Sequence, residues 1–80
     1  RSGQWVMTST EMFLSAVPQN VKDFLFADPD YTAASFADND AEYIESPSGN
    51  FYRFDIYDGD RKIEVDVNLN GEVTIARYDF

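Results

Sequence analysis

Hydrophobic residues between positions 17 and 27 recur at helical spacing. Four of them occupy positions i, i+4, i+7 and i+8, which lie on one stripe of a helix: Val17, Val21, Phe24 and Leu25. Pro18 suits the first turn of a helix, where a backbone N–H is not needed, and Pro29 disfavours the helical conformation at the residue before it. We therefore predict one helix over residues 17–27.

The segment 4–14 fits two structures. Thr8 and Glu11 stand three residues apart before an apolar run, as in the capping box that begins a helix. However, the segment is also rich in aromatic and β-branched residues, which favour strands. We expect a strand over about residues 4–11, and a helix start is the alternative.

From residue 31 onward, apolar and polar residues alternate with period two between turn residues, a pattern typical of a β-meander. One strand carries Tyr52, Phe54 and Ile56 on one face, and the next carries Ile63, Val65 and Val67. A two-residue turn at Asp58-Gly59 joins these faces and pairs residue 54 with 63 and residue 52 with 65. It also predicts two opposite-charge pairs on the other face, between Asp55 and Lys62 and between Arg53 and Glu64.

Two further hairpins are predicted to have three-residue loops. The loop 69–71, with Gly71 in the left-handed region, pairs Val67 with Val73 and Val65 with Ile75. The loop 47–49 works in the same way and sets Ile44 opposite Tyr52. A further strand is expected over residues 31–37, with Phe36 facing the core.

These elements predict a single α+β domain over residues 1–80. Its antiparallel meander has four or more strands, and the apolar helix stripe covers the apolar face of the sheet. The opposite sheet face is expected to be solvated and mixed in charge, with Arg53, Asp55, Tyr57, Lys62, Glu64, Asp66 and Thr74.

Composition narrows the classes of ligand. Six Lys and Arg against fifteen Asp and Glu give a formal net charge of −9 over 80 residues. The six cations are scattered, whereas a nucleic-acid surface needs them clustered, and an anionic membrane surface would repel the chain. No segment approaches the roughly 20 apolar residues of a membrane-spanning helix. We therefore predict neither nucleic-acid binding nor membrane insertion. The negative charge is expected to serve solubility, and attraction of a basic protein partner is the alternative.

The residue types argue against catalysis. The chain has no histidine and no cysteine, which removes the usual general base, the Ser-His-Asp arrangement and thiolate metal sites. Its carboxylates fall mostly in predicted turns or on the solvated sheet face. We predict no enzyme activity, no catalytic residues and no cofactor.

The segment 66–71 matches the first half of an EF-hand calcium loop. Asp66, Asn68 and Asn70 stand at ligand positions 1, 3 and 5, and Gly71 stands at position 6. Position 12 needs a bidentate Glu but is Arg77. The predicted hairpin accounts for all these residues without a metal, so we predict no metal site, and calcium binding is the alternative.

The order of these segments resembles PepSY-like domains, also described as beta-lactamase-inhibitor-protein-like. Their opening, "W-x-x-T … L-P-x-x-V-x-x-F/I", is similar to Trp5 and Thr8 followed by Val17-Pro18, Val21 and Phe24. Their later strands, "Y-x-V-x-L … v-x-F-D-x-x-G", are similar to Tyr52-x-Phe54-x-Ile56, Ile63-x-Val65-Asp66 and Asn70-Gly71. The chain departs from the family at Val17, where leucine is preferred, and at Asp30-Tyr31, in place of Tyr-Pro.

The resemblance implies a helix against an antiparallel sheet, no catalytic residues, and a periplasmic or secreted location. The family's name comes from proteins that inhibit enzymes by laying a sheet surface on them. Members often carry the unit in tandem, so association through the N-terminal strand or a tandem unit is a further expectation.

Four residues are candidates for protein binding. Phe51, Arg53 and Tyr57 share the predicted outer face, and the predicted register puts Tyr43 beside Arg53. Aromatic residues and arginine are enriched at interface hot spots. The alternative is that Phe51 and Tyr43 cover a sheet edge or pack under the N-terminal strand.

We therefore predict a non-catalytic extracytoplasmic protein-binding module, of which inhibition of a hydrolase is one form. The alternative is a structural or assembly domain of a repeated extracellular protein, with no ligand of its own.

Overall fold

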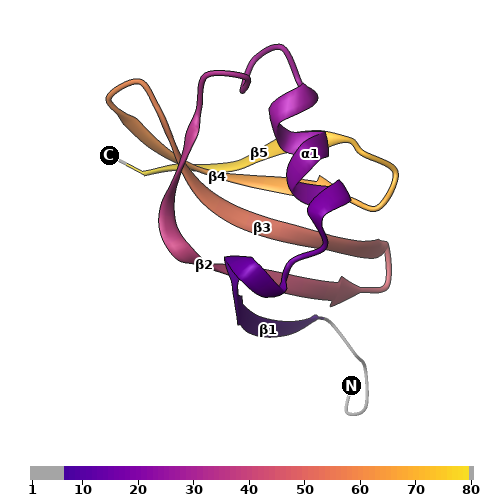
Figure 1. Ribbon diagram of the computed structural model, residues 1–80. Helices are drawn as coiled ribbons and strands as arrows, with labels where there is room; N and C mark the ends of the chain where they lie inside the picture. The colour runs from indigo at the N-terminus through magenta and orange to yellow at the C-terminus, as the bar shows by residue number, and fades with distance from the viewer. Residues whose placement is uncertain (1–6, 80) are drawn as a thin grey trace.

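Five antiparallel strands and one α-helix make up the fold, which a computed structural model describes for residues 7–79 (Figure 1). In chain order the elements are β1 (Thr8–Phe13), the 3₁₀ turn η1 (Leu14–Ala16), α1 (Gln19–Ala27), β2 (Ser35–Ser46), β3 (Gly49–Asp58), β4 (Arg61–Asn68) and β5 (Val73–Asp79). The strands lie in the order β1-β2-β3-β4-β5. The predicted α+β class and the antiparallel meander are confirmed.

The helix α1 forms where the apolar stripe predicted it, although it begins two residues later, at Gln19, directly after Pro18. It ends at Ala27, and the Asp28 carboxylate then accepts a hydrogen bond of 2.9 Å from the backbone N–H of Asp30. This local bond and Pro29 together turn the chain away from the helical path.

One hydrophobic cluster joins the helical segment to the sheet. Its buried members are Val17, Val21, Leu25, Tyr31, Ala41, Phe54, Ile56, Ile63, Val65 and Val67. Residues of α1 contact β4, and Figure 1 shows the helix lying across this part of the sheet. Full burial of one such large aliphatic or aromatic side chain contributes about 1.5–3 kcal/mol, so this cluster is the main source of stability.

The predicted N-terminal strand is confirmed as β1, which begins at Thr8; residues 4–6 of the predicted strand lie outside the residues that the structure describes. Thr8 and Glu11 do not cap a helix, because both lie in β1, paired with β2. The Lys22 ammonium group of α1 donates a 3.1 Å hydrogen bond to the carbonyl oxygen of Leu14 and thereby ties η1 to the helix.

The strand predicted over residues 31–37 is wrong as a separate element. Residues 31–33 form a turn, and a single strand, β2, begins at Ser35 and runs to Ser46. An irregularity between Phe36 and Ala41 lets this long strand change direction without ending. Phe36 lies opposite Ile56 and packs against the core, as predicted.

The β3–β4 hairpin has the predicted faces but a register that differs by two residues. Its two turn residues are Gly59 and Asp60 rather than Asp58-Gly59, so Phe54 lies opposite Val65 and Asp58 opposite Arg61. Gly59 has a φ of +66°, which suits the first central position of such a turn. A shift of two residues keeps each side chain on its face, but the predicted charge pairs are wrong.

The prediction for the β2–β3 hairpin is wrong in both loop length and face. Ser46 lies opposite Gly49, which leaves a two-residue turn at residues 47–48. The Ser46 hydroxyl donates a 2.6 Å hydrogen bond to the Gly49 carbonyl oxygen and closes this short turn. Because the loop is one residue shorter than predicted, Tyr43 rather than Ile44 lies opposite Tyr52.

The β4–β5 hairpin confirms the predicted three-residue loop. Val67 lies opposite Val73, Val65 lies opposite Ile75, and Gly71 has a φ of +88°. Ile75 is nevertheless 42% exposed, because β5 is an edge strand.

Candidate functional site

The strand register shows which side chains share the face of the sheet that points away from the core residues Phe54, Ile56 and Val65. We call it the outer face, and define it by the described side chains Ser9, Glu11, Phe13, Asp40, Glu42, Ile44, Phe51, Arg53, Asp55, Tyr57, Lys62, Glu64, Asp66 and Thr74. It brings together three of the four candidate residues, Phe51, Arg53 and Tyr57, all from β3.

Tyr43 does not belong to this group. It lies opposite Tyr52 on the core side of the sheet, with the two ring centroids 4.8 Å apart. The Asn50 side-chain amide donates a 3.1 Å hydrogen bond to the Tyr43 hydroxyl. Burial raises the pKa of Tyr52 above its ordinary value, and the nearby Tyr43 raises it further. The expectation that Tyr43 stands beside Arg53 is therefore wrong, because it depended on the three-residue loop.

Arg53 is held at the centre of the outer face by two neighbours. Its Nε and Nη2 donate hydrogen bonds of 2.8 and 3.1 Å to the two carboxylate oxygens of Asp66, directly opposite on β4. Its guanidinium carbon lies 5.5 Å from the centroid of the Phe51 ring, within the range of a cation–π interaction. The hydrogen bond to Asp66 is the largest cause of a raised pKa of Arg53; burial lowers this pKa, and the charges of Asp66, Glu64 and Glu42 add to the increase. The guanidinium is therefore a fixed, permanent positive charge.

Exposure varies along the outer face. Tyr57, near the β3–β4 turn, is 46% exposed and lies opposite Lys62. Phe51 is half-buried, and Ile44 beside it is only 1% exposed although it stands outside the main hydrophobic cluster. The face is thus less fully solvated than predicted. Of the two aromatic candidates on it, Tyr57 is more exposed than Phe51.

Three carboxylates meet beside Arg53. Asp55 lies directly opposite Glu64, and its carboxyl group is hydrogen-bonded to that of Asp38 from the irregular part of β2. Burial raises the pKa of Asp55 from 3.8 to about 6, helped by the hydrogen bond to Asp38 and the charges of Glu64 and Asp38, while Lys62 acts in the opposite direction. Sequence reasoning missed this group because the predicted register set Asp55 opposite Lys62.

Two shallow hollows flank Phe51. One, of about 230 Å³, is lined by Phe51, Asp66, Asn68, Glu72 and Thr74. The other, of about 380 Å³, lies between the β2–β3 and β4–β5 loops and is lined by Ser48, Gly49, Asn50, Phe51, Asn68, Leu69 and Asn70. Both combine the Phe51 ring with polar side chains, so they extend the outer face beside that ring.

Two of the three candidate calcium ligands, Asp66 and Asn68, have side-chain oxygens that already accept hydrogen bonds within the protein. Asp66 is paired with Arg53, and the Asn68 side-chain oxygen accepts hydrogen bonds of 3.0 and 2.9 Å from the backbone N–H groups of Asn70 and Glu72. Within residues 7–79, acidic side chains form no group of three or more that could hold a metal ion.

Comparison with protein-family models, with curated proteins and with solved structures found no match for this chain. The resemblance to PepSY-like domains therefore stays a prediction. In the part of the chain that the structure describes, no helix is long and apolar enough to cross a membrane.

Proposed function

We propose that this chain is a non-catalytic protein-binding module that contacts its partner with the outer face of the sheet. The observation that carries the proposal is the fixed position of Arg53. The guanidinium is bonded to both oxygens of Asp66 and stands over Phe51. Arginine and aromatic side chains are typical interface hot spots, and ordering them before binding removes part of the entropic cost of association.

The charge of the outer face favours a basic partner. Among the side chains described on or beside this face, Arg53 and Lys62 are the cations, whereas the carboxylates are Glu11, Asp38, Asp40, Glu42, Asp55, Glu64 and Asp66. A face of this sign attracts a basic surface over a distance and repels acidic competitors. The excess of carboxylates over cations on this face therefore supplies attraction, and Arg53 and Tyr57 supply local contacts.

The resemblance to PepSY-like domains extends the proposal to the cellular location and the activity. On this basis we propose an extracytoplasmic module, periplasmic or secreted, with inhibition of a hydrolase as one form of its activity. A structural or assembly domain of a repeated extracellular protein remains the second candidate. The observation that favours it is that β1 and β5 each pair on one side only within residues 7–79.

The test is affinity capture with the double variant Arg53→Ala/Tyr57→Ala, after circular dichroism shows that it is folded. The bait is the immobilised chain, and the source is periplasmic or culture extract. The matched control is Gln19→Ala/Asp23→Ala, which removes an exposed hydrogen-bonded pair from α1. We expect the outer-face variant to lose at least about tenfold in affinity for the captured protein, and the helix variant to bind like the wild type.

Association with a basic partner should also slow as salt is raised, because exposed charges are screened beyond about 10 Å at 0.1 M ionic strength. Full-strength capture by the folded outer-face variant would overturn the proposed surface. Capture of no specific protein would favour the structural alternative.

A further inference from the structure

The first strand of the sheet pairs on one side only in the part of the chain that the structure describes. β1 is the outermost strand, and within residues 7–79 no other strand pairs with its second side. Its pairing with β2 is regular from Thr8 to Phe13, with no bulge. It contains neither lysine nor proline, two of the residues with which natural proteins protect such edges from further pairing. The backbone of β1 is therefore regular enough to pair with a further strand along its outer side.

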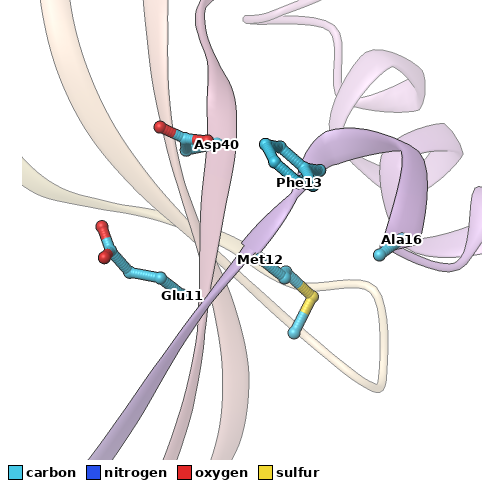
Figure 2. A pocket seen from close by; sticks show the side chains of 5 residues that line it. All are labelled: Glu11, Met12, Phe13, Ala16 and Asp40. Atoms are coloured by element: carbon cyan, nitrogen blue, oxygen red, sulfur yellow. The ribbon is translucent and has the colours of Figure 1, made fainter.

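A cavity lies at the end of this edge. It measures about 400 Å³ and is lined by Glu11, Met12, Phe13, Ala16 and Asp40. Figure 2 shows the carboxylates of Glu11 and Asp40 on one side of β1, and Met12 and Ala16 on the other. Phe13 is 69% exposed. The cavity thus combines an acidic side with an apolar side, next to the outer edge of β1.

From this combination we infer that β1 accepts an extended, basic segment of a partner protein by strand addition. Backbone hydrogen bonds along Ser9–Phe13 would hold the segment, as in other cases of added strands. One of its Lys or Arg side chains would reach Glu11 and Asp40 beside Phe13, and the next side chain of the segment, on the opposite face, would cover Met12. Lys and Arg suit such a place because their aliphatic stems pack on apolar surface while the charged end stays at the carboxylates.

Charge decides between this occupant and a second copy of the same chain. Two copies would each bring a net charge of −9 and a Glu11 to the shared edge, and like charges that face each other destabilise strand pairing. A basic segment would instead be attracted both by the net charge of the chain and by Glu11 at the edge. The inference shares Glu11 and Asp40 with the outer face but has its own test, because it depends on the backbone edge of β1 rather than on Arg53 and Tyr57.

The test uses a blocked seven-residue peptide in which lysine alternates with valine, titrated into ¹⁵N-labelled protein. We expect the amide signals of residues 9–13 to shift, and their amide hydrogens to gain protection from exchange. Two control peptides separate the causes. One carries glutamate in place of lysine, and the other is methylated at every backbone nitrogen and so cannot donate the hydrogen bonds of a strand. We expect both to bind at least about tenfold more weakly.

Two variants of matched charge locate the contact on the protein. Glu11→Gln and Asp23→Asn each remove one negative charge, the first in the cavity and the second on α1. We expect Glu11→Gln to weaken binding about twofold to fivefold, the range typical of an exposed ion pair, and Asp23→Asn to leave it unchanged. Glu11→Lys should weaken it further.

Equal binding of the lysine and glutamate peptides would overturn the inference, and so would equal binding of the methylated peptide. Signal shifts confined to β3 and β4 would also overturn it, while leaving the outer-face proposal standing. Dimerisation of the free protein through β1, detected by sedimentation and abolished in Glu11→Lys, would identify a second copy as the occupant instead.

Discussion

The ring of Phe24 in α1 lies against the backbone of Gly71 in the β4–β5 loop. A Cβ atom placed on Gly71 would come 3.0 Å from Cδ1 and 3.2 Å from Cε1 of that ring. Gly71 also has a φ of +88°, in the region that favours glycine. Glycine is thus required here both for the loop conformation and for the approach of the helix to the hairpin.

We expect Gly71→Ala to lower the free energy of unfolding by about 2 kcal/mol, because backbone strain and displacement of the Phe24 ring add. The control is Gly59→Ala. Gly59 also has a positive φ, +66°, but a Cβ there would meet nothing within 4 Å. Its substitution should cost only about 1 kcal/mol. Urea unfolding at neutral pH measures both.

A Phe24→Leu background separates the cost of displacing the ring from the cost of backbone strain at Gly71. There we expect the cost of Gly71→Ala to fall towards that of Gly59→Ala, because the smaller side chain leaves room for the methyl group. Equal costs for the two glycine variants in the wild-type background would show that the ring does not restrict the loop.

Asn68 supports the same loop through its side chain. Its Oδ1 atom accepts hydrogen bonds from the backbone N–H groups of Asn70 and Glu72, and its Nδ2 donates to the Glu72 carboxylate at 2.7 Å. We expect Asn68→Ala to cost about 1–2 kcal/mol, because two loop donors lose their acceptor. The amides of Asn70 and Glu72 should then exchange their hydrogens faster. Asn68→Asp keeps an acceptor oxygen and should recover slow exchange, and unchanged exchange in Asn68→Ala would contradict this role.

The same bonds lead us to expect no stabilisation by calcium. Asp66 is already paired with Arg53, and Asn68 with its own loop. A site with a dissociation constant a hundredfold below the added calcium would contribute about 2.7 kcal/mol, which thermal unfolding detects easily. The melting temperature should be the same in millimolar calcium as in an equal concentration of magnesium. A rise of several degrees with calcium alone would show that the loop rearranges to bind the ion.

The sequence was sufficient to predict those parts of the fold that depend on the spacing of apolar residues within a single segment. The stripe at Val17, Val21 and Leu25 predicted α1, and period-two alternation predicted the faces of β3 and β4. Hairpin registers depend on where each turn falls, and the three-residue segments 47–49 and 58–60 each allow more than one position for the turn. The two registers that differ from prediction both lie at such turns.

The candidate site was predictable to the same extent. Phe51, Arg53 and Tyr57 alternate along one strand, so they share a face in any register. Their neighbours across the sheet depend on the register. For this reason the sequence did not indicate that Arg53 pairs with Asp66, or that Asp55 stands opposite Glu64.

The meeting of Asp55 with Glu64 and Asp38 predicts an unusual dependence of stability on pH. Burial and these neighbours raise the pKa of Asp55 to about 6 in the folded protein, whereas an aspartate in an unfolded chain has a pKa of about 3.9. Between about pH 4 and pH 6 the folded state therefore binds more protons at this site than the unfolded state. Stability from Asp55 is complete below about pH 4 and is lost as pH rises through 6.

Replacement of Asp55 by asparagine removes this titration and the repulsion from Glu64. We expect Asp55→Asn to be more stable than the wild type at pH 7 by on the order of 1 kcal/mol, a value that allows for solvent screening of a partly exposed group. The advantage should shrink as pH falls towards 4, because wild-type Asp55 is then protonated. Urea unfolding at pH 4, 5, 6 and 7 measures the difference, with Asp58→Asn, at the exposed end of the same strand, as the control. A constant difference between Asp55→Asn and the wild type across this range would show that Asp55 titrates in the folded protein as it does in the unfolded chain.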